Sequence, residues 1–359
     1  SYTWADGSRY ASKSLLSEGK WVKIRVDKTG IYKLSYADLK NMGFSDPSKV
    51  SVHGYGGWPL DEDFSKEYID DVPSTPVWRG SDYLLFYGKG PVKWEYDSSS
   101  QTFVHTNNPY SLYGYYFVTD ATPTNDMTSV AQASGATNRI TTYDDYLVHE
   151  QELVSLAKSG RELYGEDFSG ATPRTLSTFS SIPGITNEDA KVTMSFVSKV
   201  TSGTGVASLS INQSNVLDVS IRSNREEYVK ALEGVSTAVW KGEKSEKNSV
   251  VVSYNSASHN NVRLNYVRLH FKRTLQPYGA YTFFRSIASI GNVSRFVVQG
   301  ANANTLVFDV TDAQRVRLME TELNGSELTF SIPAGTLREF VLVRTDQSFI
   351  SPEVVGEVE

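Results

Sequence analysis

Apolar and polar residues alternate with a period of two along much of this chain, which is the pattern of β-strands with one buried face. Residues 20–35 show it clearly, and their alternation is interrupted by the turn-forming run Asp27-Lys28-Thr29-Gly30. The pattern therefore predicts a β-hairpin across residues 20–35. A second hairpin is predicted from strand-like residues 83–87 and 92–96 on either side of Gly88-Lys89-Gly90-Pro91.

One short helix is predicted after the first hairpin. Ser35 stands three residues before Asp38, which is the arrangement of a capping box, and Gly43 follows a short run with helical periodicity. These signals predict a helix over residues 36–42. A second helical segment is expected over residues 150–158.

Most of the remaining chain is predicted to form short strands separated by turn residues. In residues 262–272 the apolar phase changes sides, and we expect a β-bulge near Asn265 to account for it. A further strand is predicted at 114–119. The other predicted strands are 191–197, 206–211, 249–254, 262–272, 295–299, 305–310, 327–332 and 337–343.

The distribution of these elements predicts a mostly β protein. Residues 120–142 are rich in Thr, Ser, Asn, Ala and Gly and are expected to form a linker or long loop. We therefore predict an N-terminal β-rich domain with a short helix at 1–142, and a β-sandwich or jelly-roll domain at 143–350. Residues 351–359 are expected to be a linker.

Composition limits the possible functions. The 359 residues include 12% aromatics, with 21 Tyr, and carry a formal net charge of -6, so nucleic acid is not an expected partner. No apolar run approaches the roughly 18 residues of a membrane-spanning helix. The start, Ser1-Tyr2-Thr3-Trp4, lacks the features of a signal peptide, so we expect either a cytosolic protein or one whose signal peptide has been removed. The sequence has no cysteine, so it has neither disulfides nor a thiol nucleophile.

No catalytic residue, metal site or cofactor is predicted. The run His53-Gly54-Tyr55-Gly56-Gly57-Trp58-Pro59 lacks the third glycine of a phosphate-binding loop, so a tight turn is favoured. The five histidines lack zinc-site spacing, and there is no G-x-S-x-G motif. Acidic residues between 61 and 71 offer oxygen ligands for calcium without an EF-hand pattern. A solvated loop is favoured there, and calcium binding stays open.

Aromatic residues are the candidate binding groups. Tyr55, Trp58 and Trp78 are expected on loops, with Tyr110 and Tyr113, where aromatic rings stack on sugars or anchor a partner. In a Tyr-rich β protein, however, most such rings serve the core and cross-strand pairs. The basic residues from Arg263 to Arg273, which include Arg268 and His270, are expected on a solvated strand face.

Several blocks in order along the chain resemble the N-terminal region of PorU-like proteins, the signal peptidases or "sortases" of the type IX secretion system of Bacteroidetes, and of their gingipain-type relatives. The blocks that carry the resemblance are Gly19-Lys20-Trp21-Val22-Lys23-Ile24, residues 29–34, 52–57 and 83–91 with Trp94, Asn108-Pro109-Tyr110-Ser111, residues 115–117 and 159–166, and Asp309-Val310-Thr311-Asp312.

The resemblance implies a parent protein that is exported and held at the outer-membrane surface. That parent is expected to cleave C-terminal sorting signals from secreted cargo and to help attach the cargo to lipopolysaccharide. Residues 351–359 are similar to the segment before the family's caspase-like domain, whose catalytic His and Cys would follow Glu359. No catalytic residue of the family is therefore assigned to a position in this chain. The resemblance leaves open whether the parent is a true signal peptidase or another gingipain-type enzyme.

Three functional hypotheses follow. The leading one is a non-catalytic region that packs against its own downstream peptidase domain and offers surface to type IX secretion components and to cargo C-terminal domains. The alternative is a carbohydrate-binding surface module of an exported bacterial protein, with glycan as its partner. A hydrolase that uses carboxylates or serine is the least favoured.

Overall fold

The computed structural model describes residues 19–59, 72–150, 165–168, 173–224, 231–257, 259 and 261–359. The start Ser1 to Trp4, the acidic stretch 61–71, the predicted helix beyond Glu150 and residues 159–164 of the family-like block lie outside the described residues. The described chain is mostly β, as predicted, with one short α-helix. None of the described helices is long and apolar enough to cross a membrane.

The chain divides into two compact units. Unit 1 comprises Ser1–Glu95, His105–Thr141 and Leu275–Glu359, and unit 2 comprises Tyr96–Val104 and Thr142–Thr274. Residues 275–350 thus group with unit 1, whereas the sequence-based division places them in the second domain. The boundaries at 142 and 350 remain a prediction for independently folding domains.

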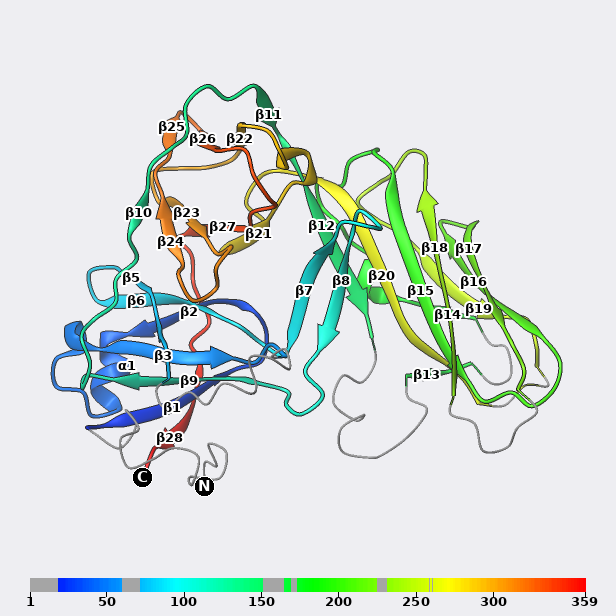
Figure 1. The fold of residues 1–359 in the computed structure, drawn as a ribbon, viewed down its shortest axis with the longest axis horizontal. Coiled ribbons are helices and arrows are strands. Elements are labelled where there is room, and N and C mark those ends of the chain that lie inside the picture. The colour runs from blue at the N-terminus through cyan, green and yellow to red at the C-terminus, as the bar shows by residue number, and fades with distance from the viewer. Residues whose placement is uncertain are drawn as a thin grey trace. The chain divides into compact units, whose positions relative to one another are not determined.

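Unit 1 contains most of the elements in Figure 1. Its helices are α1 (Tyr36–Asn41) and two short 3-10 helices, Pro47–Lys49 and Ile287–Ser289. Its strands are β1 (Trp21–Val26), β2 (Gly30–Ser35), β3 (Ser51–Gly56), β4 (Ser74–Thr75), β5 (Val77–Arg79), β6 (Tyr83–Gly88), β9 (Gly114–Thr119), β10 (Ser129–Val130), β11 (Asn138–Ile140), β21 (Tyr281–Phe284), β22 (Ser294–Val298), β23 (Thr305–Asp309), β24 (Arg317–Met319), β25 (Glu322–Asn324), β26 (Glu327–Ile332), β27 (Phe340–Arg344) and β28 (Glu353–Glu357).

Four sheets form layers within unit 1. We name them sheet I (β28-β1-β9-β3-β4), sheet II (β2-β6-β5), sheet III (β10-β24-β23-β27-β21) and sheet IV (β11-β22-β26-β25). The β1 residues that face inward pack with β2, β6 and α1 in a core between sheets I and II. The other face of sheet II packs on sheet III. Between sheets III and IV lie the rings of Phe284, Phe296, Phe330 and Phe340, which contact one another in stacked and edge-to-face pairs.

Strands β7 (Val92–Asp97) and β8 (Thr102–Asn107) form a two-stranded ribbon. The residues near its ends belong to unit 1, and its tip, Tyr96–Val104, belongs to unit 2.

Unit 2 is a sandwich of two sheets that share one hydrophobic core. We name them sheet V (β12-β20-β15-β18, with β13 paired to β20) and sheet VI (β14-β19-β16-β17). If the strands other than β13 are numbered 1 to 8 along the chain, the orders are 1-8-3-6 and 2-7-4-5. The elements are β12 (Thr142–His149), β13 (Glu166–Asp167), β14 (Arg174–Thr175), the 3-10 helix Ser177–Phe179, β15 (Ala190–Ser198), β16 (Gly205–Ile211), β17 (Ser214–Ile221), β18 (Leu232–Trp240), β19 (Val250–Tyr254) and β20 (Val262–Thr274).

Local signals in the sequence are well reproduced. The side chain of Ser35 caps α1 by accepting a hydrogen bond from the backbone N–H of Asp38 at 3.0 Å. The predicted bulge is present, because Ser195 pairs with Tyr266 and Phe196 with Leu264, which leaves Asn265 unpaired. The bulge keeps the apolar residues on both sides of it in the core of unit 2.

Both predicted hairpins are wrong in their pairing. Strand β1 pairs with β9 and β28, whereas β2 pairs with β6, so the turn at 27–30 carries the chain from sheet I to sheet II. Likewise β6 pairs with β2 and β5, and β7 pairs with β8. Strands β1 and β2 form hydrogen bonds with partners far along the chain because their apolar faces are buried between layers, which a local turn signal does not report.

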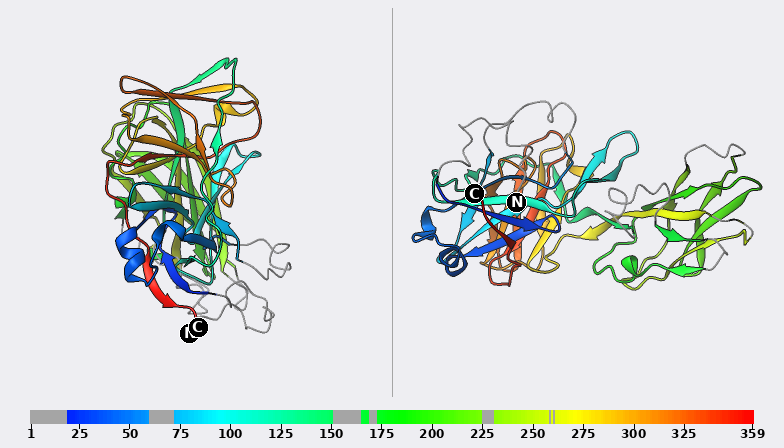
Figure 2. Two further views of the ribbon diagram at one scale, coloured as in Figure 1. Left: turned by 90° about the vertical axis from the view of Figure 1, so that its left-hand side faces the viewer. Right: turned by 90° about the horizontal axis from the view of Figure 1, so that it is seen from below.

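Two other segments differ from expectation. Residues 120–142, predicted as a linker, contain β10 and β11, which pair in parallel with β24 and β22. Residues 351–359, also predicted as a linker, contain β28, which extends sheet I beside β1 (Figures 1 and 2). Both segments gain order by pairing with a sheet edge.

Candidate functional site

The three predicted binding residues all lie in unit 1. Tyr55 is half-buried in β3, Trp58 follows that strand, and Trp78 lies in β5. Trp58 and Trp78 both pack against the core between sheets II and III. Their closest described aromatic neighbours, Tyr87 at 6.2 Å and Tyr83 at 5.8 Å, are four residues apart on β6. The structure therefore places the two indoles along one strand as partly buried packing groups.

Tyr110 and Tyr113 occupy a loop with fixed backbone geometry. The backbone N–H of Tyr110 donates to the side chain of Asn108, whose amide in turn donates to the carbonyl of Gly57 at 2.9 Å. The ring of Tyr110 is 90% exposed. The ring of Tyr113 lies 4.0 Å from the guanidinium carbon of Arg25. Of the predicted aromatics, Tyr110 is thus the most accessible to solvent.

The glycine-rich runs at 54–57 and 88–90 meet at a point of close backbone approach, together with Gly114. A Cβ at Gly114 would lie 1.9 Å from the carbonyl oxygen of Lys89, and one at Gly57 would lie 2.8 Å from the Cα of Gly114. The backbone N–H of Gly57 donates to that same Lys89 carbonyl. The glycines therefore allow three backbones to pack together, and the run at 88–90 is followed by strand β7 where a phosphate-binding loop would lead into a helix.

Lys89 lies at this junction with its ammonium group largely out of solvent. It is 7% exposed, and its Nζ lies 5.3 Å from the ring centre of Trp58. The indole N–H of Trp58 donates to the hydroxyl of Thr29 at 3.1 Å, which fixes the ring. Burial, together with the nearby charge of Lys93, lowers the pKa of Lys89 to about 8, and Asp312 opposes this shift. Within the described residues Lys89 has no ion-pair partner, so its charge is weakly compensated.

Replacing Lys89 by methionine is expected to stabilise the protein at neutral pH. The pKa of Lys89 falls from 10.5 to about 8 on folding, so the native state binds fewer protons between these values and its stability rises with pH across that window. Below pH 8, holding Lys89 charged in its buried position lowers the free energy of unfolding by up to about 3 kcal/mol. We expect the free energy of unfolding of the K89M variant to exceed that of the wild type by most of this amount at pH 7, and the difference to disappear by pH 10.5.

Urea unfolding at a series of pH values, compared with wild type, measures this difference. Lys40→Met is the matched control, because Lys40 is an exposed lysine elsewhere in unit 1 and its replacement should give a much smaller, pH-independent change in stability. A K89M gain that did not diminish above pH 8 would contradict the prediction.

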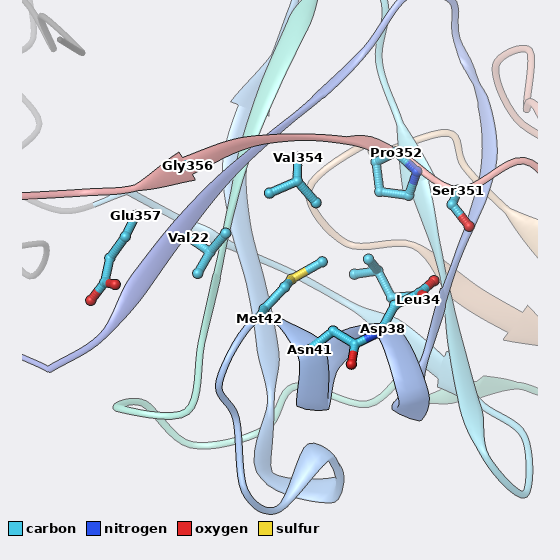
Figure 3. A pocket seen from close by; sticks show the side chains of 10 residues that line it. All are labelled: Val22, Leu34, Asp38, Asn41, Met42, Ser351, Pro352, Val354, Gly356 and Glu357. Atoms are coloured by element: carbon cyan, nitrogen blue, oxygen red, sulfur yellow. The ribbon is translucent and has the colours of Figure 1, made fainter.

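A second candidate site is a hollow of about 400 Å³ between β28 and α1, with β1 and β2 behind it (Figure 3). Its position along the edge of sheet I makes it a groove, and its lining is apolar at the centre with polar groups around it. The apolar lining residues are Val22, Leu34, Met42, Pro352 and Val354, and the polar ones are Asp38, Asn41, Ser351 and Glu357.

The segment that forms one wall of the groove is held at several points. The side chain of Arg25 makes two hydrogen bonds of 2.8 Å to the carboxylate of Glu353. The backbone N–H of Lys33 donates a hydrogen bond to the carbonyl oxygen of Ile350, and the backbone N–H of Val358 donates one to the carbonyl oxygen of Trp21. The groove is therefore a preformed feature of unit 1. The groove could not be predicted from the sequence, because residues 351–359 carry no strong strand signal.

Unit 2 contains a buried polar chain that resembles a hydroxyl–imidazole–carboxylate relay. Thr102 Oγ1 lies 2.9 Å from His270 Nδ1, and His270 Nε2 lies 2.8 Å from a carboxylate oxygen of Asp144, which also pairs with Lys272. All three relay residues are buried. The expectation that His270 and Arg268 lie on a solvated face is therefore wrong, because both are 8% exposed. With its hydroxyl shielded from solvent, the relay acts as a structural link.

No group of three or more His, Asp or Glu side chains arranged to hold a metal ion occurs among the residues that the structure describes. The acidic stretch considered for calcium lies outside those residues.

Comparison with known proteins shows what the chain is similar to. No family model and no curated protein matches the chain. Among solved structures, dimeric latent PorU from Porphyromonas gingivalis superposes with a TM-score of 0.87 and 32% sequence identity. The match covers 97% of this chain and 34% of PorU, so the chain spans about a third of that protein's length. The resemblance noted in the sequence is thereby confirmed, and we conclude that this chain is a PorU-like region.

Proposed function

We propose that this chain is the non-catalytic N-terminal region of a PorU-like, gingipain-type cysteine peptidase that processes the C-terminal sorting signals of cargo secreted by the type IX system. Its role is that of a scaffold that packs against the downstream peptidase domain and offers binding surface to secretion components and cargo. The parent is exported and acts at the outer-membrane surface.

One observation carries this proposal. The match to PorU extends over nearly the whole chain, yet the sequence has no cysteine, so the thiolate that such a peptidase needs must be supplied by residues outside it. The layered sheets of unit 1 and the sandwich of unit 2 support a scaffold role, because the layers of both units pack around buried hydrophobic cores.

The purified chain is expected to show no thiol-peptidase turnover. When it is mixed with the separately produced remainder of its parent, we expect a stable complex in size-exclusion chromatography. Bovine serum albumin in place of the chain is the negative control for the complex. Turnover by the chain alone that is inhibited by iodoacetamide would refute the non-catalytic assignment, and failure to form the complex would count against the scaffold role.

The alternative is a carbohydrate-binding module, and the strand order of unit 2 favours it. Eight strands ordered 1-8-3-6 and 2-7-4-5 fit the jelly roll, an architecture found in lectins. Glycan-array binding by the chain would support this function. Since Trp58 and Trp78 lie in unit 1, loss of binding in Trp58→Ala or Trp78→Ala would assign the glycan site to unit 1, and binding retained in both variants would assign it to unit 2. Because both indoles pack on a core, retained thermal stability of each variant is the necessary control. Binding lost together with stability would argue for a packing role.

A further inference from the structure

We propose that the groove between β28 and α1 receives an extended peptide segment in which a central apolar residue is flanked, two positions away on each side, by basic residues. The inference rests on the proposed scaffold role and names the chemistry of one partner that the scaffold binds.

The first argument is the free edge of β28. Strand β28 is the terminal strand of sheet I, and among the described residues it pairs only with β1. The side chains of Val354 on β28 and of Pro352 just before it point toward α1 across the groove (Figure 3), so alternate side chains of a strand added at the free edge would lie over the groove. An edge strand presents unpaired backbone N–H and C=O groups, which an added strand satisfies by hydrogen bonding. An extended peptide is therefore the ligand whose backbone matches this wall.

The second argument is the apolar centre of the groove. In Figure 3, Val354 lies opposite Met42, with Val22 on one side of them and Leu34 on the other. Val354 is 50% exposed although it faces this hollow, so part of its side chain lacks packing partners. A volume of about 400 Å³ accommodates a large aliphatic side chain together with its backbone. A Leu or Ile at the centre of the peptide would remove this apolar surface from water.

The third argument is charge. Asp38 and Glu357 contribute carboxylates to the lining from opposite walls, one from α1 and one from β28. In the part of the chain that is described, neither carboxylate has an ion-pair partner or a side-chain hydrogen bond. Side chains two residues apart on a strand share a face and are about 7 Å apart. Basic residues on both sides of the apolar one can thus approach these carboxylates, and acidic residues would be repelled.

Fluorescence anisotropy with the 359-residue chain tests the proposal. The probe is a fluorescein-labelled peptide, Thr-Lys-Thr-Leu-Thr-Lys-Thr, in which the Thr residues favour an extended strand. We expect saturable binding that weakens at least tenfold in the double variant Asp38→Asn/Glu357→Gln. The matched control, Asp120→Asn/Glu320→Gln, removes two exposed carboxylates elsewhere in unit 1 and should leave the affinity unchanged.

Two further measurements test the backbone and apolar contributions. The peptide with Glu in place of both Lys residues, and the peptide with alternate backbone nitrogens methylated, should each bind at least tenfold more weakly. The variant Val354→Ser, which removes the apolar side chain without adding charge, should have the same effect, and because Val354 is half-exposed the protein should still fold.

The proposal is overturned if the probe does not bind saturably to the wild type, or if either the Asp38→Asn/Glu357→Gln variant or the Val354→Ser variant binds it as strongly as the wild type does. Either outcome would leave the scaffold role intact, because that role is tested separately by complex formation with the remainder of the parent.

Discussion

Substituting Gly114 by alanine is expected to destabilise unit 1 by more than about 3 kcal/mol. The added Cβ would lie 1.9 Å from the carbonyl oxygen of Lys89 and 2.7 Å from the backbone nitrogen of Gly57. Both neighbours are backbone atoms, so no side chain can rotate to make room. The three segments that meet there would have to separate, and the hydrogen bond from Gly57 to Lys89 would be lost.

Thermal and urea unfolding of the G114A variant measures this loss. Gly335→Ala is the matched control, because a Cβ at Gly335 meets no atom within 4 Å. That control should change stability by less than about 0.5 kcal/mol. Equal stability of the two variants would show that the glycine junction is not closely packed.

Replacing Asp144 by alanine is expected to destabilise unit 2 by about 3 kcal/mol, since removal of one partner from a buried ion pair leaves the other charge uncompensated. Asp144 is 0% exposed and accepts from both His270 and Lys272. Through His270 it is also linked to Thr102 at the tip of the β7–β8 ribbon. We expect faster hydrogen exchange in β12 and β20, and in the ribbon tip.

Hydrogen-exchange mass spectrometry and urea unfolding check this effect. Asp189→Ala removes an exposed carboxylate from the same unit and should have little effect. Thr102→Val removes the hydroxyl that contacts His270 and should lower the free energy of unfolding by about 1 kcal/mol. The change in hydrogen exchange should be concentrated at the ribbon tip. Unchanged exchange in the D144A variant would mean that the relay contributes little to unit 2.

Local features were predictable from the sequence because their causes are local. The cap of α1 depends on Ser35 and Asp38, which are three residues apart. The bulge at Asn265 follows from a change of apolar phase within a single strand. The predicted strands recur in the structure with ends shifted by three residues or fewer, as for β27, where residues 337–343 were expected and Phe340–Arg344 is found.

The candidate sites were less predictable. Trp58 was noted as a binding group, but its neighbour Lys89 was seen only as part of a turn. The burial of that lysine arises from segments that are remote in the sequence, because Thr29, Trp58 and Gly114 all pack around it. The groove has the same origin, since β1 and β28 come from opposite ends of the described chain.

By itself, the sequence determined the mostly β character, the one capped helix, the bulge, the absence of a thiol and the resemblance to PorU-like proteins. These properties depend on residue type and on periodicity over a few positions. Only the tertiary structure decided which strands pair, that the chain returns to unit 1 after β20, and that Lys89 and Asp144 are buried. Strand pairing and burial are set by competition among distant segments for the same apolar surfaces, and that competition is settled only when the whole chain packs.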